Sequence, residues 1–363
     1  MPMSHHVLVV APLPPPVTGQ ALALQAVVDD LVTDCPVDVV DTMKGHYRHG
    51  FTSLAHAYRM ARAAVSIRRL VGRSDAVYMS PSQSVVGNVK DLVFLAAMGR
   101  HRRTVTLHLH GGGIHRTVFG RSRLLDELNR RLLGRVRAVI VTGDSLRDVY
   151  ADFVPAELVH TIANFAADDL YVEPDQIRRR FDQPGPLEVL FLGVLFASKG
   201  VPELLAAVEM LDRSGGGEKV HVTIAGPAVE GEVDIESWRR RVPGVSFVGE
   251  VDGAERRRLL QSSHVLCLPT SYPYEGQPLV ILEAYAAGCT VVTTNHAGIP
   301  DVFTPGVNGI GVPAGDREAV ACALRELADD RSAACSYALR NRSRADGFTR
   351  AAHIEAVRRV LLS

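Results

Sequence analysis

The sequence has no run of apolar residues that approaches the length of about 18 needed to span a bilayer. Its first six residues carry no lysine or arginine ahead of a short apolar segment, so we expect neither a signal peptide nor a membrane anchor. The five cysteines are odd in number and show no Cys-x-x-Cys spacing, which argues against a disulfide framework and a zinc site. We therefore expect a soluble, cytoplasmic protein whose cysteines are reduced core residues.

Lysine is scarce, at four residues against 36 arginines, and the formal net charge of zero hides an uneven distribution. Between residues 42 and 140 the chain has 18 lysines and arginines but four acids. These basic residues recur on amphipathic helical patterns at 59–73 and 121–137, which predicts an anionic partner, either a membrane surface or a phosphate-bearing acceptor. Dispersed, solvated arginines are the alternative. We do not expect nucleic acid as a partner, because RNA-binding aromatic signatures and zinc-finger spacings are missing.

The chain is long enough for two domains, since its 363 residues include 47% hydrophobic ones. Short β-branched runs alternate with helical patterns, which is typical of parallel sheets covered by helices on both faces. We predict strands at residues 7–10, 37–40, 76–79, 104–109, 138–142 and 158–162, then at 188–192, 221–225, 245–248, 265–268 and 290–293. The predicted fold class is therefore α/β, with two doubly wound, Rossmann-like domains.

The boundary between these domains is predicted from a segment rich in charge and proline, Asp168–Pro186. We place an N-terminal domain at 1–170, a linker at 171–186, a C-terminal domain at 187–345 and a final helical segment at 346–363.

The stretch 274–284 places two carboxylates, Glu275 and Glu283, eight residues apart around the start of a predicted helix. Gly276 permits an unusual backbone approach, and Pro278 suits a first helical position. The N–H groups of Gly276, Gln277 and Leu279 could then point outward together as a seat for phosphate. Glu283 can accept hydrogen bonds from two sugar hydroxyls. The alternative is an amphipathic helix with two solvated carboxylates.

A second motif, Leu190–Gly200, follows the first predicted strand of the C-terminal domain. It contains Gly193 and Lys199 in a strand-to-helix loop, where open α/β sheets bind ligands. A compact ammonium suits a diphosphate as a point charge, so Lys199 is a predicted ligand for one. The alternative is a surface lysine that caps a turn.

The segment 274–302, with Gly306–Gly309 and Pro313–Asp316 after it, resembles the donor-binding half of the retaining nucleotide-sugar glycosyltransferases of the GT4 family. The resemblance implies the GT-B fold, in which two Rossmann-like domains face one another across a cleft, with a last helix packing back toward the N-terminal domain. It also implies that Lys199 binds the donor diphosphate, that Glu283 holds the ribose and that Glu275 contacts the sugar. Many members carry an arginine where this chain has Val194.

Three more points of resemblance lie in the N-terminal half, which would be the acceptor side. Gly19, in the segment Ala11–Gln20, would bring backbone close to the diphosphate. His110, which ends a predicted strand ahead of three glycines, would lie beside the transferred sugar. Asn164 is the counterpart of a Pro-Asn segment in the family.

Other enzyme classes are disfavoured by missing motifs. His110–Gly113 could form a lipase-like oxyanion hole, but the Gly-x-Ser-x-Gly elbow that such hydrolases need does not occur. A Gly-x-Gly-x-x-Gly fingerprint after a strand and a metal-binding Asp-x-Asp are missing too. A nucleotide-sugar epimerase or hydrolase on the same fold stays open, as does a non-catalytic partner subunit, which Val194 favours.

We therefore expect a metal-independent transferase that moves a hexose-type sugar from a nucleoside diphosphate to a hydroxyl of a sugar, lipid-linked or other acceptor. Retention of configuration follows from the resemblance alone. The setting would be bacterial glycan, glycolipid or polysaccharide biosynthesis, in the cytoplasm or peripherally on the cytoplasmic face of the inner membrane. The nucleotide sugar is a substrate, and no cofactor is expected. The predicted catalytic residues are His110, Lys199 and Glu275; the donor-binding residues are Gly19, Gly193, Lys199, Gly276, Gln277, Leu279 and Glu283; the acceptor-side residues are Gln20, Arg116 and Asn164.

Overall fold

The computed structural model describes residues 5–43 and 54–363, which form two compact units. The first unit contains the described residues up to Asn164, the short segment Tyr274–Gln277 and the C-terminal stretch Ala351–Ser363. The second unit contains Phe165–Pro273 and Pro278–Arg350. The segment Tyr274–Gln277 thus belongs to the first unit, although its flanking residues belong to the second.

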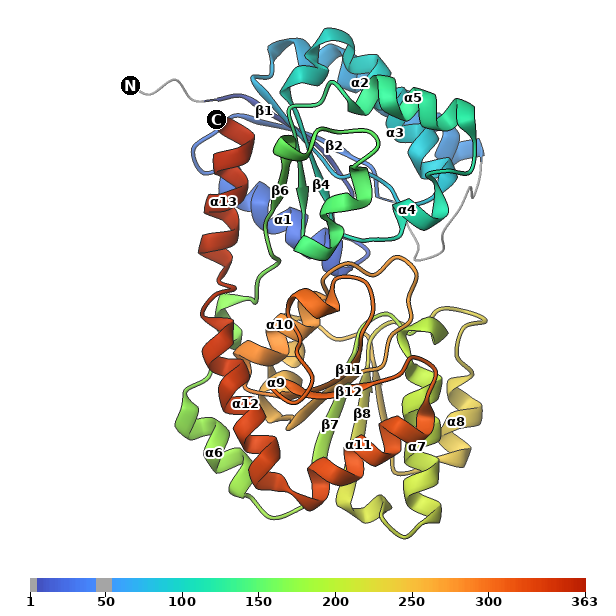
Figure 1. Cartoon of the computed structure of the whole chain (residues 1–363), viewed down its shortest axis with the longest axis vertical. Coiled ribbons are helices and arrows are strands. Elements are labelled where there is room, and N and C mark those ends of the chain that lie inside the picture. Colours follow the sequence, from blue (N-terminus) through green and yellow to red (C-terminus); the bar gives the residue numbers. More distant parts are fainter. Residues whose placement is uncertain (1–4, 44–53) are drawn as a thin grey trace. The chain divides into compact units, whose positions relative to one another are not determined.

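The first unit is built on a six-stranded sheet in which all strands run parallel, in the order β2-β1-β3-β4-β5-β6 (Figure 1). The strands are β1 (Val7–Ala11), β2 (Val37–Asp41), β3 (Ala76–Met79), β4 (Val105–Leu109), β5 (Ala138–Val141) and β6 (Val159–Thr161). The runs of β1, β3, β4 and β5 are buried throughout, as expected for strands that are covered on both faces.

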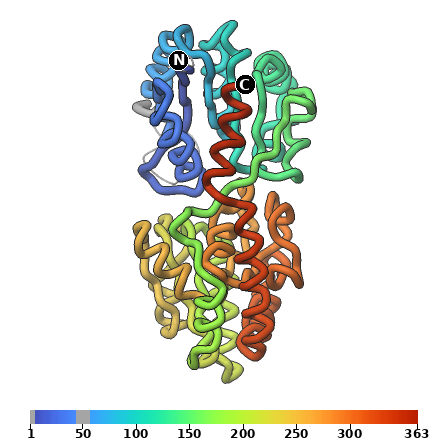
Figure 2. The backbone as a smooth tube through the Cα atoms, turned by 90° about the vertical axis from the view of Figure 1, so that its left-hand side faces the viewer, coloured from blue at the N-terminus to red at the C-terminus, as the bar shows by residue number. Residues whose placement is uncertain are grey.

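Helices cover both faces of this sheet. The helices are α1 (Gly19–Leu31), α2 (Leu54–Leu70), α3 (Val85–Met98), α4 (Ile114–Thr117), α5 (Arg123–Leu133) and α13 (Arg350–Leu362), with short 3-10 turns at 71–73, 99–104, 144–150 and 156–158. One hydrophobic core joins α2, α3 and α5 to the sheet, and another joins α1 and α13 to its other face. Figure 2 shows the C-terminal helix beside the N-terminal segments, where Arg358 pairs with Asp30 of α1.

The second unit has its own parallel sheet, in the order β12-β11-β10-β7-β8-β9. The strands are β7 (Leu187–Leu192), β8 (Val220–Ala225), β9 (Ser246–Gly249), β10 (Val265–Leu268), β11 (Thr290–Thr294) and β12 (Gly309–Val312). This is the doubly wound order whose direction reverses between β7 and β10, the place where open α/β sheets bind ligands at their carboxyl edge.

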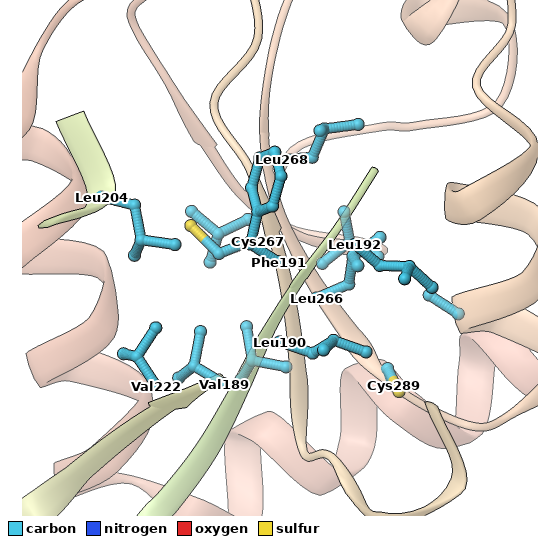
Figure 3. Packing of buried hydrophobic residues seen from close by; sticks show 14 of the residues in the cluster. Val189, Leu190, Phe191, Leu192, Leu204, Val222, Leu266, Cys267, Leu268 and Cys289 are labelled. Carbon is cyan, nitrogen blue, oxygen red and sulfur yellow. The ribbon is translucent and has the colours of Figure 1, made fainter. Parts of the chain in front are cut away.

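The helices of the second unit are α6 (Pro174–Asp182), α7 (Val201–Arg213), α8 (Ile235–Arg241), α9 (Gly253–Ser262), α10 (Leu279–Ala286), α11 (Arg317–Asp329) and α12 (Arg331–Ala345), with 3-10 turns at 168–170, 197–199, 217–219 and 299–301. Aspartates cap α8, α9, α11 and α12 by accepting a backbone N–H of the first turn. In the core, Cys267 lies with Val189 and Leu204 on one side of the sheet, and Cys289 lies with Leu190 and Leu266 on the other (Figure 3). All five cysteines are free.

The prediction of two doubly wound α/β domains is confirmed, and each of the eleven predicted strands is present within one or two residues of its predicted bounds. Strand β12 was not predicted, because its four residues include two glycines. The segment 171–186, expected to be a linker, contains α6 and belongs to the second unit. Its Ile177 and Phe181 stand one turn apart and are buried in that unit's core, which a reading based on charge and proline overlooks.

Within residues 5–43 and 54–363, each helix is too short or too polar to cross a bilayer.

Candidate functional site

In the second unit, the loops that follow β7 and β10 lie against each other at the reversal point of the sheet. Gly200 adopts a left-handed φ of 87°, and a Cβ at this position would lie 2.4 Å from the carbonyl oxygen of Pro269. The backbone N–H of Ser271 donates to the carbonyl of Ser198 at 2.8 Å. The Lys199 loop therefore depends on glycine for its close approach to the loop after β10.

The ammonium of Lys199 is placed by an aromatic side chain of the neighbouring loop. Its Nζ lies 4.7 Å from the centre of the Tyr272 ring, within the range of a cation–π interaction. The Tyr272 ring in turn stacks on Phe196, with centroids 5.4 Å apart and planes 14° apart. Gly193, predicted to bind the donor, follows β7 directly and donates its N–H to Ala225 at 3.0 Å.

Glu283 is buried within α10 and forms an ion pair with Arg256 of α9. Arg256 engages carboxylate Oε2 and is the only side-chain partner that Glu283 has among the described residues. A buried carboxylate needs such a partner, because removing an ion from water costs several kcal/mol. Oε1 remains for a ligand, so Arg256 takes part of the hydrogen-bonding capacity that the sequence analysis assigned to sugar hydroxyls.

The start of α10 differs by one position from the prediction. Pro278 is the N-cap residue and Leu279 is the first helical residue. The cap has no side-chain hydrogen bond, and the first N–H groups of a helix have no acceptor within it. Leu279 therefore sits where an anion could be bound, and its role in binding the donor stays a prediction.

In the first unit, the segment Tyr274–Gln277 crosses the loop that follows β4. The N–H of Gly112 donates to the carbonyl of Glu275 at 2.8 Å. A Cβ on Gly276 would lie 2.3 Å from the carbonyl oxygen of His110, so only glycine fits there. The glycine of this motif is thus required by a close approach to His110, and its φ is not among the left-handed ones.

Gln277 and Asn164 hold each other in a buried hydrogen-bond network. The backbone N–H of Asn164 donates to Gln277 Oε1, and its Nδ2 donates to the carbonyl of Gln277, each at 2.7 Å. Gln277 Nε2 donates to the carbonyl of Thr142 at 2.8 Å. The Gln277 side chain is therefore occupied, so the predicted donor contact rests on its backbone N–H. Asn164 Oδ1 is buried and makes no well-aligned hydrogen bond to a described residue.

His110 is a partly exposed residue that lies beside the buried His108 and has buried ring nitrogens. Its ring centre is 4.0 Å from that of His108, whose Nδ1 is 2.5 Å from the hydroxyl of Tyr78. Both ring nitrogens of His110 are buried and make no well-aligned hydrogen bond within the described part of the chain. Burial, and to a lesser degree repulsion by His353, lowers the pKa of His110 to about 3, although Asn164 opposes this shift. His110 is therefore a neutral imidazole at pH 7, with one donor and one acceptor nitrogen.

The other predicted residues of the first unit lie around this group or at the surface. Gly19 begins α1 and is exposed, behind the Thr18 cap. Gln20 Nε2 donates to Ser80 Oγ at 2.8 Å, so its side chain is partly used in holding the ends of α1 and β3 together. Arg116 is exposed on α4, and its guanidinium has no side-chain partner among the described residues.

Sequence reasoning missed three residues: Arg256, Tyr272 and His108. Of these, His108 carried a signal, because residues two apart on a strand point to the same face, here that of His110. The described residues contain no group of three or more His, Cys, Asp or Glu placed to hold a metal ion.

Comparison with known proteins identifies the second unit. Residues 186–330 match the family model of glycosyl transferases group 1. The glycogen synthase of Mycobacterium tuberculosis is 33% identical over 155 residues, which cover 43% of this chain and 37% of the relative. A putative colanic acid biosynthesis glycosyltransferase, WcaL of Salmonella typhimurium, is 29% identical over 164 residues, which cover 41% of this chain and 38% of the relative. The chain thus matches less than two-fifths of the length of these curated relatives.

A solved structure extends the likeness to the whole chain. HepE of Anabaena, crystallised in complex with UDP-glucose, superposes with a TM-score of 0.74 over 99% of this chain and 100% of its own, at 17% identity. At this identity the likeness shows the shared fold. The chain therefore has the GT-B fold, and its second unit is a domain of the glycosyl transferases group 1 family.

Proposed function

We propose that the protein transfers a hexose-type sugar from a nucleoside diphosphate to an acceptor hydroxyl, in bacterial glycan, glycolipid or polysaccharide biosynthesis. The observation that carries the proposal is the place of Lys199. It stands in the group 1 domain, after β7, at the reversal point of the sheet, where ligands of doubly wound folds bind. The presence of UDP-glucose in HepE favours a uridine nucleotide sugar as the first donor to try.

In the second unit, the proposed work is donor binding and leaving-group stabilisation. As the glycosidic bond breaks, negative charge grows on the departing diphosphate, and Lys199 with the N–H groups at the start of α10 would stabilise it. Glu283 would accept hydrogen bonds from the ribose through the oxygen that Arg256 leaves available. No metal is required in this scheme, because the ammonium and the helix start supply the positive charge.

In the first unit, the proposed work is to hold the sugar and the acceptor. A neutral His110 can hydrogen-bond a sugar hydroxyl without placing a second positive charge beside an oxocarbenium-like centre. Glu275, whose backbone carbonyl accepts the N–H of Gly112 in the loop that follows β4, would contact the other hydroxyls. Gln20, Arg116 and Asn164 complete the proposed acceptor side, and Gly19 would bring backbone close to the diphosphate of the donor. Departure and attack would share one face of the sugar, so configuration would be retained.

The basic character of the first unit supports a further part of the proposal, peripheral binding to an anionic membrane surface. Helix α3 packs between α2 and α5, and all three expose apolar side chains. These are Tyr58 and Val65 on α2, Val85, Val86, Val89 and Val93 on α3, and Leu124 and Leu128 on α5. Exposed arginines lie beside them on α2 and around α5. Apolar side chains with flanking cations are what an anionic lipid surface binds.

The transferase proposal is tested in two steps. A thermal-shift screen of UDP-, GDP- and ADP-sugars identifies the donor, and label in its sugar is then followed in the presence of chelator and candidate acceptors. Label on an acceptor supports transfer, label in a rearranged nucleotide sugar indicates an epimerase, and free labelled sugar indicates a hydrolase. Lys199→Ala should lower kcat more than about tenfold with an unchanged melting temperature. A fully active Lys199→Ala protein, or no nucleotide sugar bound, would overturn the proposal.

A further inference from the structure

The loop that carries Lys199 lacks a second cation at the position where the GT4 resemblance expects one, because residue 194 is valine. A lysine side chain has four rotatable bonds, and confining its ammonium to one place costs conformational free energy. If Lys199 binds a diphosphate, the affinity for the diphosphate depends on how far the ammonium is already confined in the free protein. The structure shows one contact that confines it, with the ring of Tyr272.

Tyr272 is itself held firmly by its neighbours. Its carbonyl accepts a hydrogen bond from His296 Nε2 at 2.8 Å, and its N–H donates to Thr270 Oγ1 at 3.1 Å. Its ring stacks nearly parallel on Phe196, three residues before Lys199 in the same loop. The ammonium of Lys199 lies over that fixed ring.

The two loops are joined through their backbones as well. Ser198, directly before Lys199, accepts the N–H of Ser271, directly before Tyr272. Gly200, directly after Lys199, lies against the backbone of Pro269. The distance between Lys199 and Tyr272 is therefore set by backbone contacts on both sides of the lysine, so the ring meets the ammonium without a rearrangement of either loop.

We propose that Tyr272, stacked on Phe196, is a positioning residue that preorganises the Lys199 ammonium for the diphosphate of the donor. This inference rests on the proposed function, since it takes a diphosphate as the ligand of Lys199. The second cation that the resemblance expects at residue 194 would bind the diphosphate by its charge. In this proposal the aromatic pair of Tyr272 and Phe196 takes over part of that role. The pair adds no charge of its own and acts only through Lys199.

The readout is the ratio of UDP affinity to UMP affinity, measured by titration calorimetry on the full chain, with GDP and ADP pairs in parallel. This ratio isolates the contact to the second phosphate, because a general loss of folding weakens both ligands together. Tyr272→Leu should lower the ratio roughly three- to tenfold, in the range of a cation–π interaction that is partly withdrawn from water. Tyr272→Phe keeps the ring and should keep the ratio within about twofold.

Two further variants separate positioning from packing. Phe196→Leu removes the stacking partner alone and should lower the ratio by less than Tyr272→Leu does. The matched control is Tyr337→Leu on α12, which removes another ring that lies under a cation, Arg340, and should leave the ratio unchanged. In a Lys199→Ala background, Tyr272→Leu should have no further effect, because the two residues act as one unit.

The outcomes distinguish this inference from the function on which it rests. A Lys199→Ala protein with an unchanged ratio would overturn the diphosphate role itself. If Lys199→Ala lowers the ratio and Tyr272→Leu does not, the role of Lys199 stands and the positioning role of Tyr272 is wrong. An equal loss in Tyr272→Phe and Tyr272→Leu would assign the effect to the hydroxyl and would also overturn it.

Discussion

Glu283 lies buried in α10 and depends on Arg256 for its neutralisation. We expect Glu283→Gln to weaken binding of the nucleoside diphosphate about tenfold, because a hydrogen bond to a charged acceptor contributes about 1.5–3 kcal/mol. Titration calorimetry measures this loss directly. Glu255→Gln is the matched control, since Glu255 is a glutamate of α9 paired with the exposed Arg258. Equal affinities in wild type and Glu283→Gln would contradict the ribose assignment, as would an equal loss in the control.

At the same scale, the positions of the motif residues were predictable but their partners were not. Lys199 and Glu283 were identified because an ammonium and a carboxylate occur in loops and helix starts that suit a nucleotide. Their partners Tyr272 and Arg256 stand 73 and 27 positions away in the sequence, and the second pair joins different helices. Such pairings depend on which strands are neighbours in the sheet, and the order of the strands cannot be predicted from the local sequence.

At the scale of elements, α2, α3 and α5 form the layer that exposes apolar side chains among arginines. We expect the protein to co-sediment with vesicles that contain phosphatidylglycerol at low ionic strength, and to be released at high salt, because screening weakens attraction between exposed charges. Val86→Ser combined with Val93→Ser on α3 should reduce the bound fraction several-fold, since both valines are exposed and apolar.

Val248→Ser is the control for this experiment, because Val248 is an exposed valine of β9 in the second unit. The membrane proposal is wrong if the protein stays in the supernatant at low salt, or if the control and the α3 variant lose binding equally.

Two other elements show where helix and strand assignment from sequence succeeds or fails. The run that became β1 is continuous and apolar, and that of β7 is apolar apart from Glu188, so burial on both faces follows from composition. Helix α6 begins with a capping box at Glu173 and with Pro174, which are start signals of a helix. Its many charges nevertheless favour the prediction of a linker, unless its two buried side chains are recognised as the apolar face of a helix. A helix of nine residues needs a neighbouring core to be stable, and that core is remote in sequence.

At the scale of the molecule, each unit contains a histidine that is withdrawn from water and whose pKa is lowered. Burial is the main cause in both, and it brings the pKa of His110 to about 3 and that of His264, which also lies near Arg331 and Arg180, to about 4. The unfolded chain binds these protons near pH 6.5 while the folded chain does not. The contribution of neutral His110 to stability is therefore complete above about pH 6.5 and falls as the pH decreases toward its folded pKa.

We therefore expect the free energy of unfolding to be lower at pH 5 than at pH 7.5, with about 2 kcal/mol of the difference due to His110. Denaturant titrations at the two pH values measure this difference, and His110→Gln should show a smaller one. If the free energy of unfolding differs between the two pH values by the same amount in wild type and variant, His110 is protonated equally in the folded and unfolded chains.

The sequence alone was sufficient for the class of fold, the number of sheets and the positions of eleven of the twelve described strands, and it predicted the loops that we propose to carry the chemistry. These features follow from local hydrophobic patterns and from the rule that parallel strands present their following loops at one edge. Three-dimensional packing was needed to show that Gly276 meets His110, that the Gln277 side chain is engaged by Asn164 and that Tyr272 supports Lys199. Each of these contacts joins distant parts of the chain, and it exists because the core brings those parts together.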